Sequence, residues 1–394
     1  MSDQTDLTPA VSLPAGFKIR EVDSRYVNRP AALAATQAAP NLGPLADFVG
    51  DWHGHGFNTI FRPNNPITPT PLPIPQNTSD NILELNLTRE VLSFSPSLGS
   101  VPNRGAEQGD VFLNGVPYLQ TINDVNDPKN PIGIHLEPGI WIIVPSTTNP
   151  NEGPTLTRMA SIPHGTTIEA QGTFFTVAGG PKIDPVDMTP FTTVVPPATP
   201  KLIRFPSQTA DNKETPRLPQ DLTSFINDKT ITQAMLDDPN TVLRDAIAGQ
   251  NIVSTNVIVI STKPAAPLFG GGTDNIAFLL GDDEARKPNA QAVQMTAIFW
   301  IETVEHTLQI PVFRRGQEPL MLSADASKAG GPVPRFLAAP PMEITAPRTI
   351  KFHTKQIQYT QTVMLNFKGL TWPHVSVATL VPAHPIVIPP SAWN

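Results

Sequence analysis

One stretch near residue 50 decides the fold: Gly50-Asp51-Trp52-His53-Gly54-His55-Gly56-Phe57, continuing as Asn58-Thr59-Ile60-Phe61-Arg62-Pro63. Strand alternation places Trp52, Gly54 and Gly56 on one face and the two histidines with Phe57 on the other. Glycine weakens a strand interior unless the strand must bend or another backbone must come close. Two glycines on the Trp52 face therefore predict a sharply coiled first strand that opens a β-barrel.

The composition describes a chain with a large core and stiff loops. The 394 residues include 46 prolines, more than twice the average share of roughly 5%. Apolar residues still make up 39%, enough to build a core, so the prolines are expected to punctuate a β-rich fold.

Several functional classes are disfavoured from the start. The net charge is −7 and no basic run occurs, which argues against nucleic acid as a partner. The chain has no cysteine, so disulfides, thiolate metal sites and cysteine nucleophiles are excluded. Its polar start lacks a secretory signal, and no apolar run reaches 18 residues, so we expect no membrane span and a cytoplasmic protein.

The hydrophobic pattern predicts many short strands and one small helical insert. Strands are expected at 50–57, 81–95, 171–177, 256–262, 275–281, 292–304, 350–367 and 375–381, with hairpins or strand pairs over 110–122, 132–144 and 156–170. Helical periodicity is confined to 221–250, where the last segment ends before Gly249. The glycine run 270–272 precedes no helix, so a phosphate loop is not expected. The pattern predicts a mainly β protein, either a barrel or a sandwich.

Five stretches, in order, resemble the nitrobindin family of haem-binding β-barrels, whose architecture is similar to that of fatty-acid-binding proteins. They are 50–60 with its Gly-x-Trp-x-Gly-x-Gly pattern, 112–121 with Gly-Val-Pro-Tyr-Leu, 135–141 with His-Leu-Glu-Pro-Gly-Ile-Trp, 160–172 with Pro-His-Gly and Glu169, and 359–380. The resemblance implies a lipocalin-like antiparallel barrel, enlarged by extra strands and the small helical insert. It divides the chain into a Pro/Ala-rich arm at 1–40, a barrel built from 41–177 and 350–394, and an insertion at 178–349.

The same resemblance implies haem b as cofactor and His374 as its metal ligand. Trp372 would pack on a porphyrin edge. The other residues that the matched stretches place near a cofactor are Tyr359, Met364, His135 and Trp52. The family's basic residue after the third motif is Ile142 here, a departure from the family pattern in the expected binding site.

The remaining histidines and one carboxylate have alternative interpretations. His53 and His55 share a face and would suit a metal pair, but we expect them on the outer surface. His135 and Glu137 are expected to form a buried hydrogen-bonded pair or to face the pocket, and His164 lies in a turn that is expected to be exposed. Glu302 follows an apolar strand and is expected to point inward, with Arg314 or Arg315 as its partner.

The leading hypothesis is a haem protein that handles nitric oxide, peroxynitrite or peroxide. One alternative is a haem-free carrier of an apolar small molecule, which needs a closed apolar cavity. The other is a structural or assembly protein, which forms a homo-oligomer through the arm and insertion. No serine-hydrolase or zinc-protease motif occurs, so whether the chain is an enzyme stays open.

Overall fold

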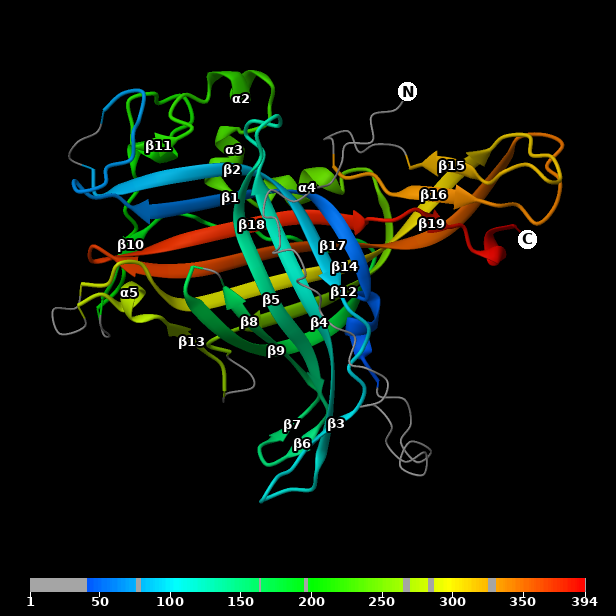
Figure 1. Ribbon diagram of the computed structural model, residues 1–394, viewed down its shortest axis with the longest axis horizontal. Coiled ribbons are helices and arrows are strands. Elements are labelled where there is room, and N and C mark those ends of the chain that lie inside the picture. The colour runs from blue at the N-terminus through cyan, green and yellow to red at the C-terminus, as the bar shows by residue number, and fades with distance from the viewer. Residues whose placement is uncertain are drawn as a thin grey trace, which may run out of the picture.

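The computed structural model describes residues 41–75, 79–162, 164–194, 198–264, 270–282, 287–324 and 331–393. The arm predicted at 1–40 lies outside the described residues. Ten antiparallel strands close into a barrel because the first and last members of the path, β2 and β4, also pair with each other. In spatial order they are β2 (Asn81–Phe94), β1 (Gly50–Pro63), β18 (Leu370–Pro382), β17 (Arg348–Phe367), β14 (Gln291–Ile310), β12 (Asn251–Ser261), β9 (Thr166–Ala178), β8 (Thr155–Ile162), β5 (Ile132–Val144) and β4 (Val111–Asp124) (Figure 1). The predicted mainly β barrel is confirmed.

The glycines of β1 bring the first strand very close to its neighbour. A Cβ added at Gly54 would meet the Thr379 carbonyl oxygen at 1.9 Å, and one at Gly56 would meet that of Val377 at 2.0 Å. Side chains of any size are excluded there, since backbone atoms cannot give way. The close approach of β1 to β18 is therefore the physical reason for glycine at these two positions.

Apolar side chains fill one end of the barrel. A 3-10 turn, η2 (Gly43–Asp47), closes that end, and Phe48 behind it stacks on Phe94 with ring centroids 4.6 Å apart. The indole of Trp52 donates to the Phe48 carbonyl oxygen at 2.7 Å. Trp141 and Phe299 continue the same cluster across the barrel, so this half of the interior is a packed core.

The predicted insertion supplies two strands of the barrel wall. β12 and β14 lie within 178–349, and both belong to the closed sheet, so the predicted boundary does not separate barrel from insertion. The part of the segment that precedes β12 covers the outside of the wall. Its helices are α2 (Thr223–Asn227), α3 (Gln233–Asp237) and α4 (Thr241–Ala246), and its short pieces are β10 (Phe191–Thr192), η3 (Pro206–Gln208) and β11 (Arg217–Leu218). A second apolar cluster, which includes Phe61, Trp372 and Leu243, lies between these helices and the wall.

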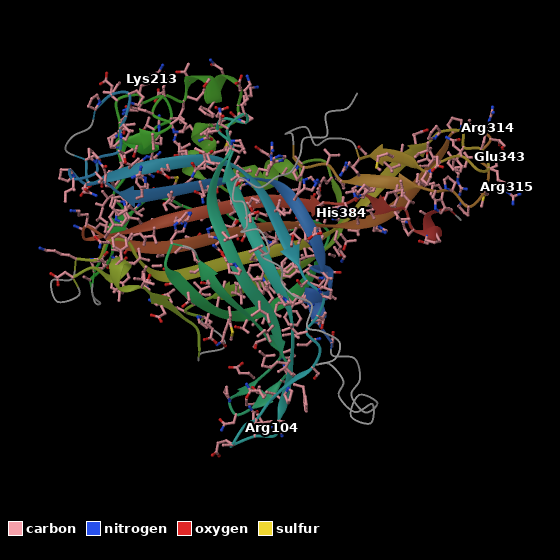
Figure 2. The ribbon with its side chains drawn as sticks, viewed as in Figure 1. Arg104, Lys213, Arg314, Arg315, Glu343 and His384 are labelled. Atoms are coloured by element: carbon pink, nitrogen blue, oxygen red, sulfur yellow. The ribbon has the colours of Figure 1, made fainter. Side chains whose placement is uncertain are left out.

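Two 20-residue strands extend beyond the barrel and form a projecting arm (Figure 1). β14 and β17 carry a small sheet of β15 (Leu320–Ser323), β16 (Arg335–Ala338) and β19 (Ile386–Val387), followed by η4 (Pro390–Trp393). A third apolar cluster with Phe336 and Trp393 holds the arm together. Arg314, Arg315 and Glu343 lie at its far end (Figure 2).

Three local predictions were wrong. Segment 110–122 is not a hairpin, because Gly115 sits inside the single strand β4, where a Cβ would meet the Trp141 carbonyl oxygen at 2.4 Å. Segment 132–144 is likewise one strand, β5. The strand predicted at 275–281 is the short helix α5 (Ala277–Leu280), next to β13 (Gly272–Asn275). The remaining strands are β3 (Val101–Asn103), β6 (Thr147–Thr148) and β7 (Asn151–Glu152).

Candidate functional site

A polar pocket occupies the barrel end opposite the apolar core. Six strands and the β8–β9 turn contribute to its lining: Asn58, Ile60, Glu84, Asn86, Gln120, Ile122, Ile134, His135, His164, Tyr359, Gln361, His374 and Ser376. The enclosed space is about 80 Å³, and the pocket opens to solvent past His164, which is exposed. This is the place where three histidines from distant parts of the chain come together.

His374 is held in its neutral form inside this pocket. Asn58 Nδ2 donates to His374 Nε2 at 2.8 Å and to the Ser376 hydroxyl at 2.7 Å. Burial, together with the nearby His164 and His135, lowers the pKa of His374 to about 3. A neutral imidazole keeps a lone pair for a metal or a hydrogen-bond donor, so His374 has the protonation state that a ligand residue needs.

A buried ion pair between Glu137 and Arg158 contacts His135 in the pocket lining. Glu137 is fully buried, and its Oε1 accepts from Arg158 Nη2 and from the Tyr118 hydroxyl. Its other oxygen lies 3.1 Å from His135 Nε2. Burial acts to raise the pKa of Glu137, but Arg158 and His135 outweigh it and lower the pKa to about 2. The predicted buried His135–Glu137 pair is confirmed, and the pair also holds the His135 ring at the pocket wall.

A second buried carboxyl, that of Glu90, has a raised pKa, whereas that of Glu137 is lowered. Glu90 accepts hydrogen bonds from the Tyr359 hydroxyl at 2.6 Å, from Thr88 Oγ1 at 3.1 Å and from Gln120 Nε2 at 3.3 Å. No cation pairs with it among the ion pairs of the described residues. Burial therefore dominates and raises the pKa of Glu90 to about 7, so Glu90 holds or releases a proton near neutral pH.

His164 stands at the mouth of the pocket, in the turn between β8 and β9. Its ring centroid lies 5.9 Å from that of His135. Partial desolvation of its ring at the pocket rim, together with the neighbouring His135, lowers the pKa of His164. The prediction that this residue is exposed in a turn is confirmed, and the turn brings it to the pocket rim.

The structure gathers only some of the residues predicted to contact a cofactor. His374, His135 and Tyr359 line the pocket. Trp52 belongs to the apolar core at the other end of the barrel, six residues along β1 from Asn58, which is roughly 20 Å of strand. Trp372 packs against Phe61, Phe205 and Phe367 in the cluster outside the wall, so it is separated from the pocket by the strand itself. Met364 is half-buried on β17 and is likewise absent from the pocket lining.

Glu302 has a different position from the predicted one. The neighbouring Ile301 joins the interior core, while Glu302 lies on the outer face under the helical insert. It accepts from Gln356 Nε2 at 2.6 Å rather than pairing with Arg314 or Arg315. Burial raises the pKa of Glu302 to about 8. It is a buried acid that packs the insert onto the wall.

His53 and His55 lie on the outer face of β1, as predicted, since Trp52 takes the interior face.

No group of three or more histidine, aspartate or glutamate side chains among the described residues is arranged to hold a metal ion. No helix in the described part of the chain is long and apolar enough to cross a membrane.

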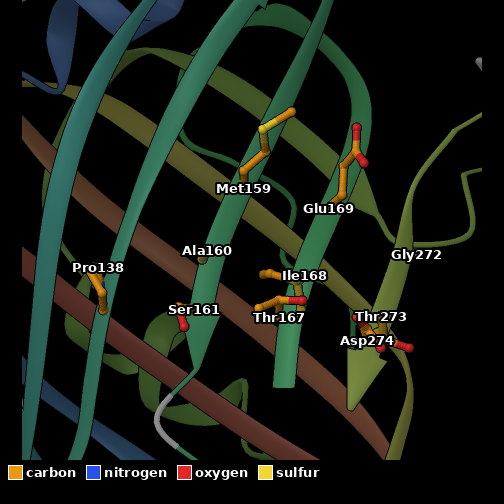
Figure 3. Close-up of a pocket in the computed structure, with 10 residues that line it drawn as sticks. All are labelled: Pro138, Met159, Ala160, Ser161, Thr167, Ile168, Glu169, Gly272, Thr273 and Asp274. Atoms are coloured by element: carbon orange, nitrogen blue, oxygen red, sulfur yellow. The ribbon is translucent and has the colours of Figure 1, made fainter. Parts of the chain in front are cut away.

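A larger hollow lies in the side of the barrel, and no histidine lines it. It measures about 580 Å³ and is lined by β8, β9, β13 and Pro138 of β5. β5 pairs with β8 only from Gly139 onward, so the strands diverge beside this hollow. Figure 3 shows Met159 and Glu169 on the strands that border it. The hollow is wide and open, and its lining includes none of the buried titratable groups, so the end pocket is the better candidate site.

Most of the buried polar residues in and beside the pocket were not predicted from the sequence. Asn58 lay within the opening motif but was not singled out. Glu90, Gln120 and Arg158 face the interior at alternating strand positions that usually carry apolar residues in a barrel. Polar residues at such positions are the signal that reveals a buried network before the structure is known.

Comparisons with known proteins add little to this geometry. No family model matches the chain, and no curated protein matches it. Among solved structures, the crystal structure of Rv2717c from M. tuberculosis matches with 10% sequence identity and a TM-score of 0.31, covering 90% of this chain and 99% of that chain.

Proposed function

We propose that this protein binds haem b in the end pocket, where His374 would be the residue that holds the iron. The observation that supports the proposal is a neutral imidazole held at the bottom of a polar pocket that opens at the barrel end. The five stretches that resemble the nitrobindin family point to the same residue.

The histidine in the pocket is a suitable ligand for haem iron, but the enclosed volume of the pocket is small for a porphyrin. A neutral histidine is a common axial ligand, and coordination through Nε2 would replace the hydrogen bond from Asn58. The enclosed 80 Å³ is well below the roughly 300–1,000 Å³ of pockets that bury drug-sized ligands. A bound porphyrin would therefore extend beyond this enclosed space.

The surrounding side chains define what the protein would contribute. Bound haem would supply iron chemistry toward nitric oxide, peroxynitrite or peroxide. Asn58, whose amide also donates to the Ser376 hydroxyl, orients the His374 ring before a ligand binds, and burial excludes the proton that would block coordination. His135, Gln120 and Tyr359 present polar groups to any small molecule at the pocket floor.

Haem titration followed by absorbance tests the proposal. Wild-type protein should shift the Soret band with a one-to-one end point, and His374→Ala should abolish or alter that shift. His384→Ala is the matched control, because His384 is exposed and contacts Asp51 at the other end of β1. A wild-type protein that leaves the Soret band of free haem unchanged, or a His374→Ala spectrum identical to wild type, would contradict it.

The small, polar enclosed space favours one alternative, a haem-free site for a small polar molecule. The apolar-carrier hypothesis has less support, because side chains pack the apolar half of the barrel. Native mass spectrometry of the purified protein separates these cases: an added mass of a few hundred daltons or less, without haem absorbance, would favour the small-ligand site.

A further inference from the structure

We propose that Glu90 is a proton store for the end pocket and that the Tyr359 hydroxyl carries its proton to a ligand bound there. The inference rests on the proposed ligand site but concerns residues that coordinate no metal. It assigns a role to a buried acid on β2 and a buried phenol on β17, strands that are not neighbours in the barrel wall.

The geometry supplies a continuous path from the acid to the pocket. Glu90 itself is not part of the pocket lining and is only 1% exposed. Tyr359 lines the pocket and reaches Glu90 Oε2 with its hydroxyl at 2.6 Å. Gln120, which also lines the pocket, donates to the same hydroxyl at 3.0 Å and fixes its position. Tyr359 is therefore the group that joins the buried carboxyl to the pocket.

The charged groups around this pair leave the acid without a fixed countercharge. His135 on β5 acts on Glu90 from across the pocket, and Arg158 on β8 acts on Tyr359. Arg158 is already neutralised by Glu137, to which it is bonded. One carboxyl is thus locked as an anion, and the other is free to exchange its proton. Carboxyls held in such contrasting environments are typical of acid–base pairs.

The proton transfer is balanced over two oxygen atoms. In the structure the Tyr359 hydroxyl donates to Glu90 Oε2 at 2.6 Å. When Glu90 is protonated, this hydrogen bond reverses, so that the carboxyl hydroxyl donates to the phenol oxygen and the phenol hydroxyl turns to the ligand. The Glu90 proton then moves to the phenol oxygen as the phenol proton moves to the ligand. Glu90 ends as a carboxylate, Tyr359 ends again as a phenol, and the ligand gains one proton. Burial raises the pKa of Tyr359 well above its ordinary value, so the phenol passes a proton on without remaining as a phenolate.

Infrared spectroscopy of the ligand-free protein tests the relay without haem. In a Glu302→Gln background, which removes the other neutral buried acid, the protonated-carboxyl band should titrate near neutral pH and disappear in Glu90→Gln. After transfer to D₂O, Tyr359→Phe should slow deuteration of that band by about tenfold, the effect expected from losing one hydrogen bond along the path. The matched control is the Glu90→Gln chain that keeps Glu302: the deuteration rate of its Glu302 carboxyl band should be the same with and without Tyr359→Phe.

The possible outcomes separate the two proposals. A carboxyl band unaffected by Glu90→Gln, or equal deuteration rates with and without the Tyr359 hydroxyl, would overturn the proton store even if haem binds. A Soret band that haem titration leaves unchanged would overturn haem binding but leave the infrared result standing. If haem binds, the pH dependence of its spectrum should lose one transition in Glu90→Gln, and an unchanged pH profile would count against the relay.

Discussion

Replacing Arg158 by methionine should destabilise the barrel strongly, because it leaves a buried carboxylate without its cation. Glu137 is fully buried, and Arg158 is 2% exposed. Removing one partner of a buried pair costs about 3–5 kcal/mol. The guanidinium also lies 5.4–5.7 Å from the ring centroids of Tyr118, Trp141 and Phe299, contacts that methionine replaces only in part. We therefore expect a loss in the upper part of that range at pH 7.

The pH dependence gives the prediction a sign. The folded-state pKa of Glu137, about 2, lies below its ordinary value of 4.5. The pair therefore contributes stability that is present above pH 4.5 and lost as the pH falls toward 2. In Arg158→Met the carboxyl is free to take up a proton in the acid range, so the difference in stability between the two proteins should shrink from pH 7 to pH 4.

Urea unfolding followed by tryptophan fluorescence provides the assay, since Trp141 lies directly against Arg158. The double variant Glu137→Leu/Arg158→Met is the control: it removes both charges and should be less destabilised than Arg158→Met alone. The single variant Glu137→Leu completes the set. A loss below about 1 kcal/mol in Arg158→Met, or a double variant whose loss equals the sum of the losses in Arg158→Met and Glu137→Leu, would refute the reasoning.

Three further predictions concern the wall and its covering. The raised folded-state pKa of Glu302 gives the wild-type protein stability below pH 4.5 that is lost as the pH rises through 8. Glu302→Gln should therefore remove this decline in the free energy of unfolding between pH 4.5 and 8. Urea midpoints that run parallel for both proteins across this range would contradict it. Gly54→Val should prevent closure of β1 on β18, since its Cβ has no space beside the Thr379 carbonyl, and a native-like circular dichroism spectrum and melting temperature would show the packing argument to be wrong. Trp372→Ala should cost about 3–5 kcal/mol, as large core truncations do, while leaving the wavelength of any haem Soret band unchanged; a shifted band would place this side chain at the cofactor after all.

The barrel was predictable because its signals are local. The glycines of β1 must tolerate a close backbone, and alternating apolar residues must find an interior, so the first strand and the mainly β class could be read from the sequence. Gly115 shows the limit of the same reasoning. A glycine beside an asparagine is typical of a hairpin turn, but here it meets the requirement for close approach within a continuous strand.

The boundaries and the site depended on long-range contacts that no local pattern contains. Strands β12 and β14 belong to the barrel because they pair with β9 and β17, although they lie inside the predicted insertion. Trp372 is two residues from His374, and simple alternation would put both on one face. The indole instead donates to the Phe367 carbonyl at the β17–β18 turn and packs outside the wall.

The His374 ligand assignment can be tested most directly with a cavity variant. His374→Gly removes the imidazole from the pocket, and free imidazole added to the haem-loaded variant can occupy the vacated position. We expect the absorbance spectrum of the variant to differ from that of wild type and to return to it as imidazole is added. A variant spectrum that already equals the wild-type spectrum before imidazole is added would show that His374 does not bind the iron.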